Sequence, residues 1–189
     1  MHDELALQPG HLIAFAAPDA SRDQLLELIA RLALRTPLLV VDAGNQFNAY
    51  RVARQLRRQT ADLHPALERI RLVRPFTVYQ FMALLERPPA PIPIVVLDLL
   101  MLFYDEDVAL DESQRLLARS LARLTEMKRA APVLVGARPP NRLVPERIVL
   151  LHALAAASDF FLQRAASGPD GSAHPLPAAA APRLPGFEE

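Results

Sequence analysis

The chain contains no cysteine, and lysine occurs once, at Lys128. The absence of cysteine excludes disulfide bonds and thiolate metal sites. The five histidines are scattered without the spacing of metal ligands, so no metal site is expected. The 21 basic and 21 acidic side chains give a formal net charge of +0 at pH 7. That balance argues against a strong stand-alone nucleic-acid binder, because such proteins usually present a basic surface.

Long apolar runs are also absent, although apolar residues make up 51% of the 189 residues. The longest runs have the length of strands and not of membrane spans. The first four residues lack the basic start of a signal peptide, so a cytoplasmic protein is expected, with no membrane partner. The length predicts one domain, over residues 1–165. Residues 166–189, rich in proline and alanine, are predicted to be a disordered tail.

Apolar segments of strand length alternate with segments of helical period. Strands are predicted over residues 12–16, 37–42, 70–74, 94–98, 133–135 and 160–163. Helices are predicted over residues 25–32, 47–58, 77–86, 112–129 and 149–157. Thr77 and Gln80 have the spacing of a capping box at the start of the third of these helices. Apolar strands that alternate with helices are typical of an α/β fold with a mostly parallel sheet and helices on both faces.

The loop after the first predicted strand lacks the residues of an ATP-binding loop. In the pattern GxxxxGK[ST], the glycines would fall on Ala17 and Arg22, the lysine on Asp23 and the hydroxyl on Gln24. Asp23 replaces the required cation with an anion, which would repel a triphosphate. Ser21 and Gln24 have the spacing of a capping box, so the helix start is expected to be closed by its own side chains.

The fourth predicted strand ends in Asp98, where P-loop proteins hold magnesium with a carboxylate. The simpler interpretation is a polar strand end that accepts hydrogen bonds from a neighbouring loop. We favour it, because the other parts of a nucleotide site are missing together.

Three segments in this order resemble the core of the RecA-type recombinases, especially the archaeal and eukaryotic recombinases and their paralogs. They are residues 42–47 (Asp-Ala-Gly-Asn-Gln-Phe), 94–104 and 133–138. The resemblance spans roughly residues 10–164 and implies a RecA-like P-loop NTPase core. The water-activating glutamate of the family would fall on Gly44 and is absent. The chain therefore resembles a pseudo-ATPase that lacks a functional P-loop, and neither catalysis nor a cofactor is expected.

In that family the fifth strand leads into a loop that contacts single-stranded DNA. The corresponding residues here include Arg138, Arg142 and Arg147, which are candidate phosphate contacts. The alternative is a solvated face whose arginines pair with nearby acids. Phe76, Tyr79 and Phe81 are candidates for base stacking, although packing against the core or a partner is the commoner use of such residues.

The resemblance implies a non-catalytic accessory factor in DNA recombination or repair. Its expected partners are single-stranded DNA, an active RecA-like ATPase, or further copies of itself. The alternative is a scaffold or regulatory module with no nucleic-acid role, which the neutral net charge favours. A third hypothesis is an enzyme that holds a nucleotide in a different pose.

Overall fold

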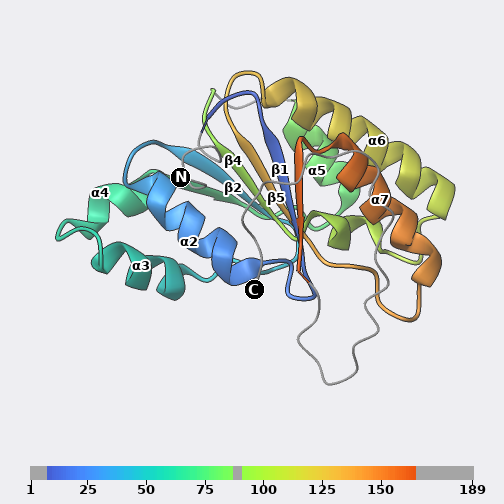
Figure 1. Ribbon diagram of the computed structural model, residues 1–189, viewed down its shortest axis with the longest axis horizontal. Helices are drawn as coiled ribbons and strands as arrows, with labels where there is room; N and C mark the ends of the chain where they lie inside the picture. The colour runs from blue at the N-terminus through green and yellow to red at the C-terminus, as the bar shows by residue number, and fades with distance from the viewer. Residues whose placement is uncertain (1–7, 87–90, 165–189) are drawn as a thin grey trace.

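The computed structural model describes residues 8–86 and 91–164 and contains one six-stranded sheet (Figure 1). Its strand order is β3-β2-β4-β5-β1-β6, and every pairing is parallel. The strands are β1 (Leu12–Ala16), β2 (Leu38–Asp42), β3 (Ile70–Val73), β4 (Ile94–Leu97), β5 (Val133–Ala137) and β6 (Phe160–Gln163). The predicted α/β fold with a parallel sheet is confirmed.

Helices cover both faces of this sheet, as Figure 1 shows. One face carries α2 (Arg22–Ala33), α3 (Ala49–Arg57) and α4 (Leu63–Glu68). The other carries α5 (Val78–Glu86), α6 (Leu110–Met127) and α7 (Ile148–Ala157). There are also two short 3-10 helices: η1 (Leu99–Phe103) follows β4, and η2 (Pro145–Arg147) directly precedes α7.

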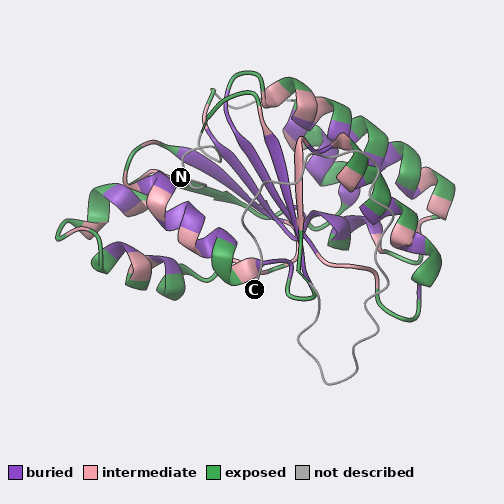
Figure 2. Cartoon of the chain, in the orientation of Figure 1, coloured by how far each residue is buried: buried purple, intermediate pink, exposed green. Residues whose placement is uncertain are grey.

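The core consists of two apolar clusters, one on each face of the sheet. Successive side chains of a strand point to opposite faces. Ile13 and Phe15 of β1 accordingly join the cluster under α2, while Leu12 and Ala14 join the cluster under α6. Figure 2 shows the central strands buried along their length. The two edge strands differ from them: Leu72 and Val73 of β3 are exposed, and β6 is only partly buried.

The predicted elements agree with the observed ones to within a few residues, but α4, η1 and η2 were not predicted. The segment of residues 63–68 has only six residues, with Pro65 among them, and is too short to show a helical period. The run that forms η1 is uniformly apolar, which does not separate a helix from a strand. The predicted tail, residues 166–189, lies outside the described residues. No helix of the described part is long and apolar enough to cross a membrane.

The parallel arrangement brings the loops that follow the strands to one edge of the sheet. This carboxyl edge holds the loop after β1, Asp42 at the end of β2, and Asp98 just after β4. Strand β5 lies between β1 and β4. Ligands of open α/β sheets bind at this edge, so it is the first place to look for a site.

Candidate functional site

The loop between β1 and α2 is closed by its own hydrogen bonds. The amide of Ala17 donates to the Ala137 carbonyl at 3.1 Å, and the amide of Ala20 donates to the Ala17 carbonyl at 2.8 Å. The amides of Ser21 and Arg22 both donate to Asp19, to its carboxylate at 3.2 Å and its carbonyl at 3.1 Å. A phosphate-binding loop needs such amides free to point at the ligand. Here these four already have partners.

The backbone of the loop is also tightly folded onto the sheet. Ala20 and Ser21 have φ angles of 53° and 51°, a left-handed conformation that is uncommon outside glycine. A Cβ built on Gly136 of β5 would lie 2.6 Å from the Ala20 carbonyl oxygen and 3.5 Å from the Asp98 amide. The loop therefore packs on Gly136, close to the end of β4.

The predicted capping box at the start of α2 is wrong. Ser21 is the N-cap residue, but its side chain makes no capping hydrogen bond. Its left-handed backbone differs from the extended conformation from which an N-cap hydroxyl normally reaches the next turn. Asp19 satisfies the nearby amides instead. The wider expectation, that the chain itself closes this helix start, agrees with these contacts.

Arginine and aspartate side chains surround this closed loop. Asp23 pairs with Arg51 of α3 and lies 3.4 Å from Arg22 Nε. The hydrogen bond from Arg51 is the main reason that the pKa of Asp23 lies below its ordinary value. Asp19 accepts two hydrogen bonds from Arg164 at 2.7 and 2.9 Å. Each cation near the loop thus faces a carboxylate and not an open phosphate site.

Like Asp42, Asp98 is a fully buried acid at the carboxyl edge. Its exposed fraction is 0%, and its backbone is left-handed, with φ at 57°. Oδ2 accepts two hydrogen bonds from Arg138, one of them from Nε at 2.6 Å, whereas Oδ1 has no partner. Burial raises the pKa of Asp98 above its ordinary value, and the Arg138 cation opposes that rise. The favoured interpretation of Asp98, a strand end bonded to a neighbouring loop, is what the structure contains.

Asp98 also fills the space beside Gly44, the residue onto which the water-activating glutamate of the RecA-type recombinases would fall. A Cβ built on Gly44 would lie 2.4 Å from Asp98 Oδ2 and 2.5 Å from Asp98 Cβ. No real Cβ contact is that short, so any side chain at residue 44 would displace Asp98. The glycine and the buried aspartate therefore depend on one another.

Asp42, at the end of β2, forms a second buried ion pair. Its Oδ2 accepts from Arg74 Nε at 3.0 Å and Nη2 at 2.8 Å, while Oδ1 accepts from the Gln46 amide at 2.6 Å. Both carboxylates at the edge are thus held by arginines of this chain. A magnesium–triphosphate group does not fit these residues. The two carboxylates that could face the metal ion are bonded to arginines, and the four loop amides described above already have acceptors.

The three arginines proposed as nucleic-acid contacts lie in different surroundings. Arg138 turns inward to Asp98. Arg147 is only 4% exposed and donates to the carbonyls of Phe103 and Val108, each at 2.6 Å, so its proposed phosphate contact is wrong. Arg142 is exposed and has no ion pair among the described residues. No local sequence pattern distinguishes the three arginines, because the burial of Arg147 depends on carbonyls about 40 residues away.

The arginine stripe on α6 agrees with the alternative of a solvated face. Arg115 pairs with Glu112 at 2.8 Å, Arg119 lies 3.9 Å from Glu86, and Arg123 pairs with Glu126. Each of these cations has an acidic neighbour, so the stripe carries no unpaired basic surface.

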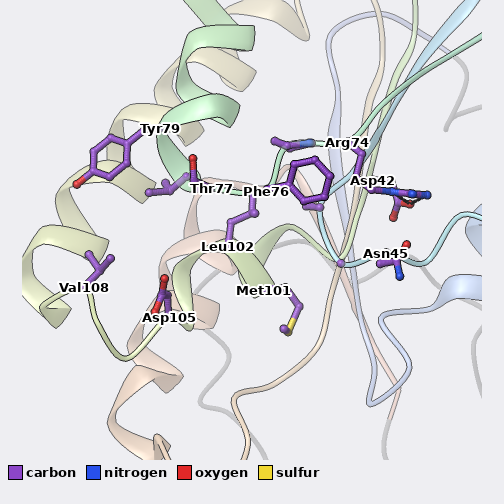
Figure 3. A pocket seen from close by; sticks show the side chains of 14 residues that line it. Asp42, Asn45, Arg74, Phe76, Thr77, Tyr79, Met101, Leu102, Asp105 and Val108 are labelled. Atoms are coloured by element: carbon purple, nitrogen blue, oxygen red, sulfur yellow. Dashed lines mark hydrogen bonds and ion pairs between the residues drawn. The ribbon is translucent and has the colours of Figure 1, made fainter.

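A pocket of about 600 Å³ lies at the same edge, beside the Asp42–Arg74 pair (Figure 3). We call it the aromatic pocket; its wall includes Phe76, Tyr79, Met101, Leu102, Asp105 and Val108. Phe76 and Tyr79 are 79% and 59% exposed and Met101 is 40% exposed. Figure 3 shows them projecting from the start of α5 and from η1. These two aromatic residues were candidates from the sequence, but the pocket was not predicted, because η1 was not predicted. Phe81, the third stacking candidate, is fully buried in the core and is therefore not placed to stack a base.

No family model matches the chain, and no curated protein matches it significantly.

Proposed function

We propose that the chain is an ATPase-inactive, RecA-like accessory factor in DNA recombination or repair, which acts by binding partners. One observation carries this proposal. The parallel sheet has six strands, while four amides of the loop after β1 and Oδ2 of Asp98 are hydrogen-bonded to other groups of the chain itself. A fold kept without its catalytic site is suited to presenting surfaces to other molecules.

The proposed partner is an active RecA-type ATPase on single-stranded DNA. RecA-type proteins place the nucleotide at subunit interfaces, so an inactive relative can still contact an active neighbour. Any direct DNA contact rests on Arg142, because Arg138 and Arg147 are engaged within the protein. One exposed arginine supports a weak electrostatic contribution and not tight binding.

The second candidate is a scaffold that binds protein only. The observation that favours it is the same engagement of Arg138 and Arg147, which leaves one of the three proposed phosphate contacts exposed. The two candidates differ in whether complex formation depends on DNA.

Fluorescence anisotropy with labelled single-stranded DNA, with and without an active RecA-type ATPase, separates them. We expect the chain to change the amount of ATPase bound to DNA, and the Arg142→Ala variant to weaken this effect. If Arg142 contacts a phosphate, the slope of log affinity against log salt should fall by about 1. Arg119→Ala, which removes an exposed arginine of α6, is the matched control.

A complex with the ATPase that is equally strong without DNA would favour the scaffold. No complex and no effect on DNA binding in either condition would contradict the proposed function.

A further inference from the structure

The loop between β5 and α7 is held rigidly at both ends. At its start, Arg138 is bonded to Asp98, and the Tyr104 hydroxyl donates to the Arg138 carbonyl at 2.8 Å. At its end, the buried Arg147 binds the carbonyls of Phe103 and Val108. Both attachments fix the loop to the segment that follows β4. A loop fixed in this way can present its outermost residues without a large loss of conformational entropy.

We call residues 141–143 (Asn-Arg-Leu) the loop tip. The Asn141 side chain accepts from the amides of Leu143 at 2.8 Å and Val144 at 3.3 Å, a local turn that orders the tip. Leu143 is nevertheless 81% exposed, and the neighbouring Arg142 has no ion pair among the described residues. The rigid loop therefore holds a large apolar side chain and a free cation out in solvent.

The aromatic pocket is complementary to the loop tip, since it combines an apolar wall with neighbouring acidic residues. Its apolar wall includes the exposed Phe76, Tyr79 and Met101. Asp105 lies in the wall, and Glu106 and Asp107 follow it in an exposed turn. None of these three carboxylates forms an ion pair with a described residue. An apolar side chain would bury apolar surface in this pocket, and a cation next to it would be attracted by Asp105 and the two acids that follow it.

This acidic turn does not suit DNA. The carboxylates would repel phosphates, so Phe76 and Tyr79 are poorly placed to stack the bases of a bound strand. Within one chain, Leu143 remains 81% exposed, so the tip does not fill its own pocket. An apolar side chain that fills the pocket would therefore come from another molecule. A second copy of this chain offers Leu143 with the neighbouring cation Arg142.

From this complementarity we infer that two copies of the chain associate through their carboxyl edges, with Leu143 of each copy in the aromatic pocket of the other and Arg142 beside Asp105. This dimer and the proposed DNA contact of Arg142 exclude one another, so DNA would compete with dimer formation. The loop tip follows β5, and the pocket follows β2, β3 and β4, so both lie at one edge of a parallel sheet. Two features on the same edge allow a two-fold arrangement, in which each contact is made twice.

Sedimentation velocity over a range of protein concentrations tests the association. We expect a monomer–dimer equilibrium for the unaltered chain. Leu143→Ala and Phe76→Ala should each raise the dissociation constant about tenfold or more, as for a central apolar contact. Leu143 and Phe76 are largely exposed, so neither change threatens folding, and circular dichroism verifies this. Tyr50→Ala is the matched control, since Tyr50 is 71% exposed and lies outside the pocket.

A charge exchange distinguishes the specific contact from general adhesion. Arg142→Glu should weaken the dimer by like-charge repulsion, and the double variant Arg142→Glu with Asp105→Arg should restore it. The absence of native cysteine permits a second readout. When Leu143→Cys and Met101→Cys variants are mixed under oxidation, a disulfide should join the two different chains.

A monomer at every concentration overturns the inference, and so does a dimer that Leu143→Ala and Phe76→Ala leave unchanged. Failure of the double charge variant to recover would also overturn the assigned contact. If a basic, apolar segment of another protein occupies the pocket instead, the chain alone stays monomeric, which likewise rejects the second copy as occupant.

Discussion

Replacing Arg138 with alanine should lower the free energy of unfolding by about 3 kcal/mol at neutral pH, the lower end of the cost of breaking a buried ion pair. The physical reason is the position of Asp98, which is 0% exposed and has no partner on Oδ1. Without Arg138, the other oxygen would lose its partner too. We expect the lower end of that range because the Arg138 side chain is 33% exposed, so part of the ion pair is already in contact with solvent. Urea unfolding of both proteins measures this loss.

The loss should depend on pH. Burial raises the pKa of Asp98 in the folded protein. A raised pKa means that the folded state binds the proton more tightly, so this group's stabilising contribution is present at acid pH and is lost as pH rises through the raised pKa. Removing Arg138 removes the cation that opposes burial and raises this pKa further. The free energy of unfolding of the Arg138→Ala variant should therefore be closest to that of the unaltered protein at acid pH, and the difference should grow as pH increases.

Asp98→Asn supplies the control for this prediction. The double variant Arg138→Ala with Asp98→Asn leaves no buried charge at residue 98, so it should be more stable than Arg138→Ala alone at neutral pH. A penalty for Arg138→Ala that is the same at all pH values would show that Asp98 is not the group responsible.

The Arg147→Ala variant should lose more than about 3 kcal/mol of unfolding free energy, because charged hydrogen bonds are removed and buried acceptors are left unpaired. Arg147 donates to the Phe103 and Val108 carbonyls and to Ser113 Oγ at 3.1 Å. It thereby joins the segment after β4 to the start of α7. Chemical denaturation measures the loss.

Arg142→Ala is the matched comparison, since this exposed arginine should change stability by less than about 0.5 kcal/mol. Arg147→Lys should be intermediate, because a single ammonium group replaces a guanidinium that now donates from two nitrogens. An Arg147→Ala protein with unaltered stability but weaker DNA binding would contradict the structural role and would return Arg147 to the nucleic-acid contacts.

The sequence was sufficient to predict the strands, because each is a short apolar run bounded by turn residues or charges. The strand at residues 12–16 and the one at residues 160–163 agree with the structure at both ends. The same pattern carries no information on which strands pair. The placement of β5 between β1 and β4 had to come from the structure.

Local capping was predicted with mixed success. The Thr77 hydroxyl accepts from the Gln80 amide at 3.2 Å, as a capping box requires. The Gln80 side chain, however, accepts from the amide of Phe76, one residue earlier than expected. At Ser21 the spacing was the same, but the left-handed backbone removed the interaction. Residue types define what a cap can do, and backbone conformation decides whether it forms.

The candidate site was the least predictable part. The sequence showed that the phosphate-loop residues are missing, but not what replaces them. The partner of Asp98 lies 40 positions away, and the residue that excludes a glutamate at Gly44 is Asp98 itself. Such contacts arise from the packing of loops at one sheet edge. No local pattern encodes them.

The central claim of the proposed function is that the chain's own side chains and amides occupy the positions where a P-loop protein binds a nucleotide, so that no triphosphate binds there. Titration calorimetry with ATP and Mg²⁺ tests it most directly. We predict no saturable heat for the unaltered chain. A saturable one-site isotherm that is lost in the Asp98→Asn variant would contradict the claim.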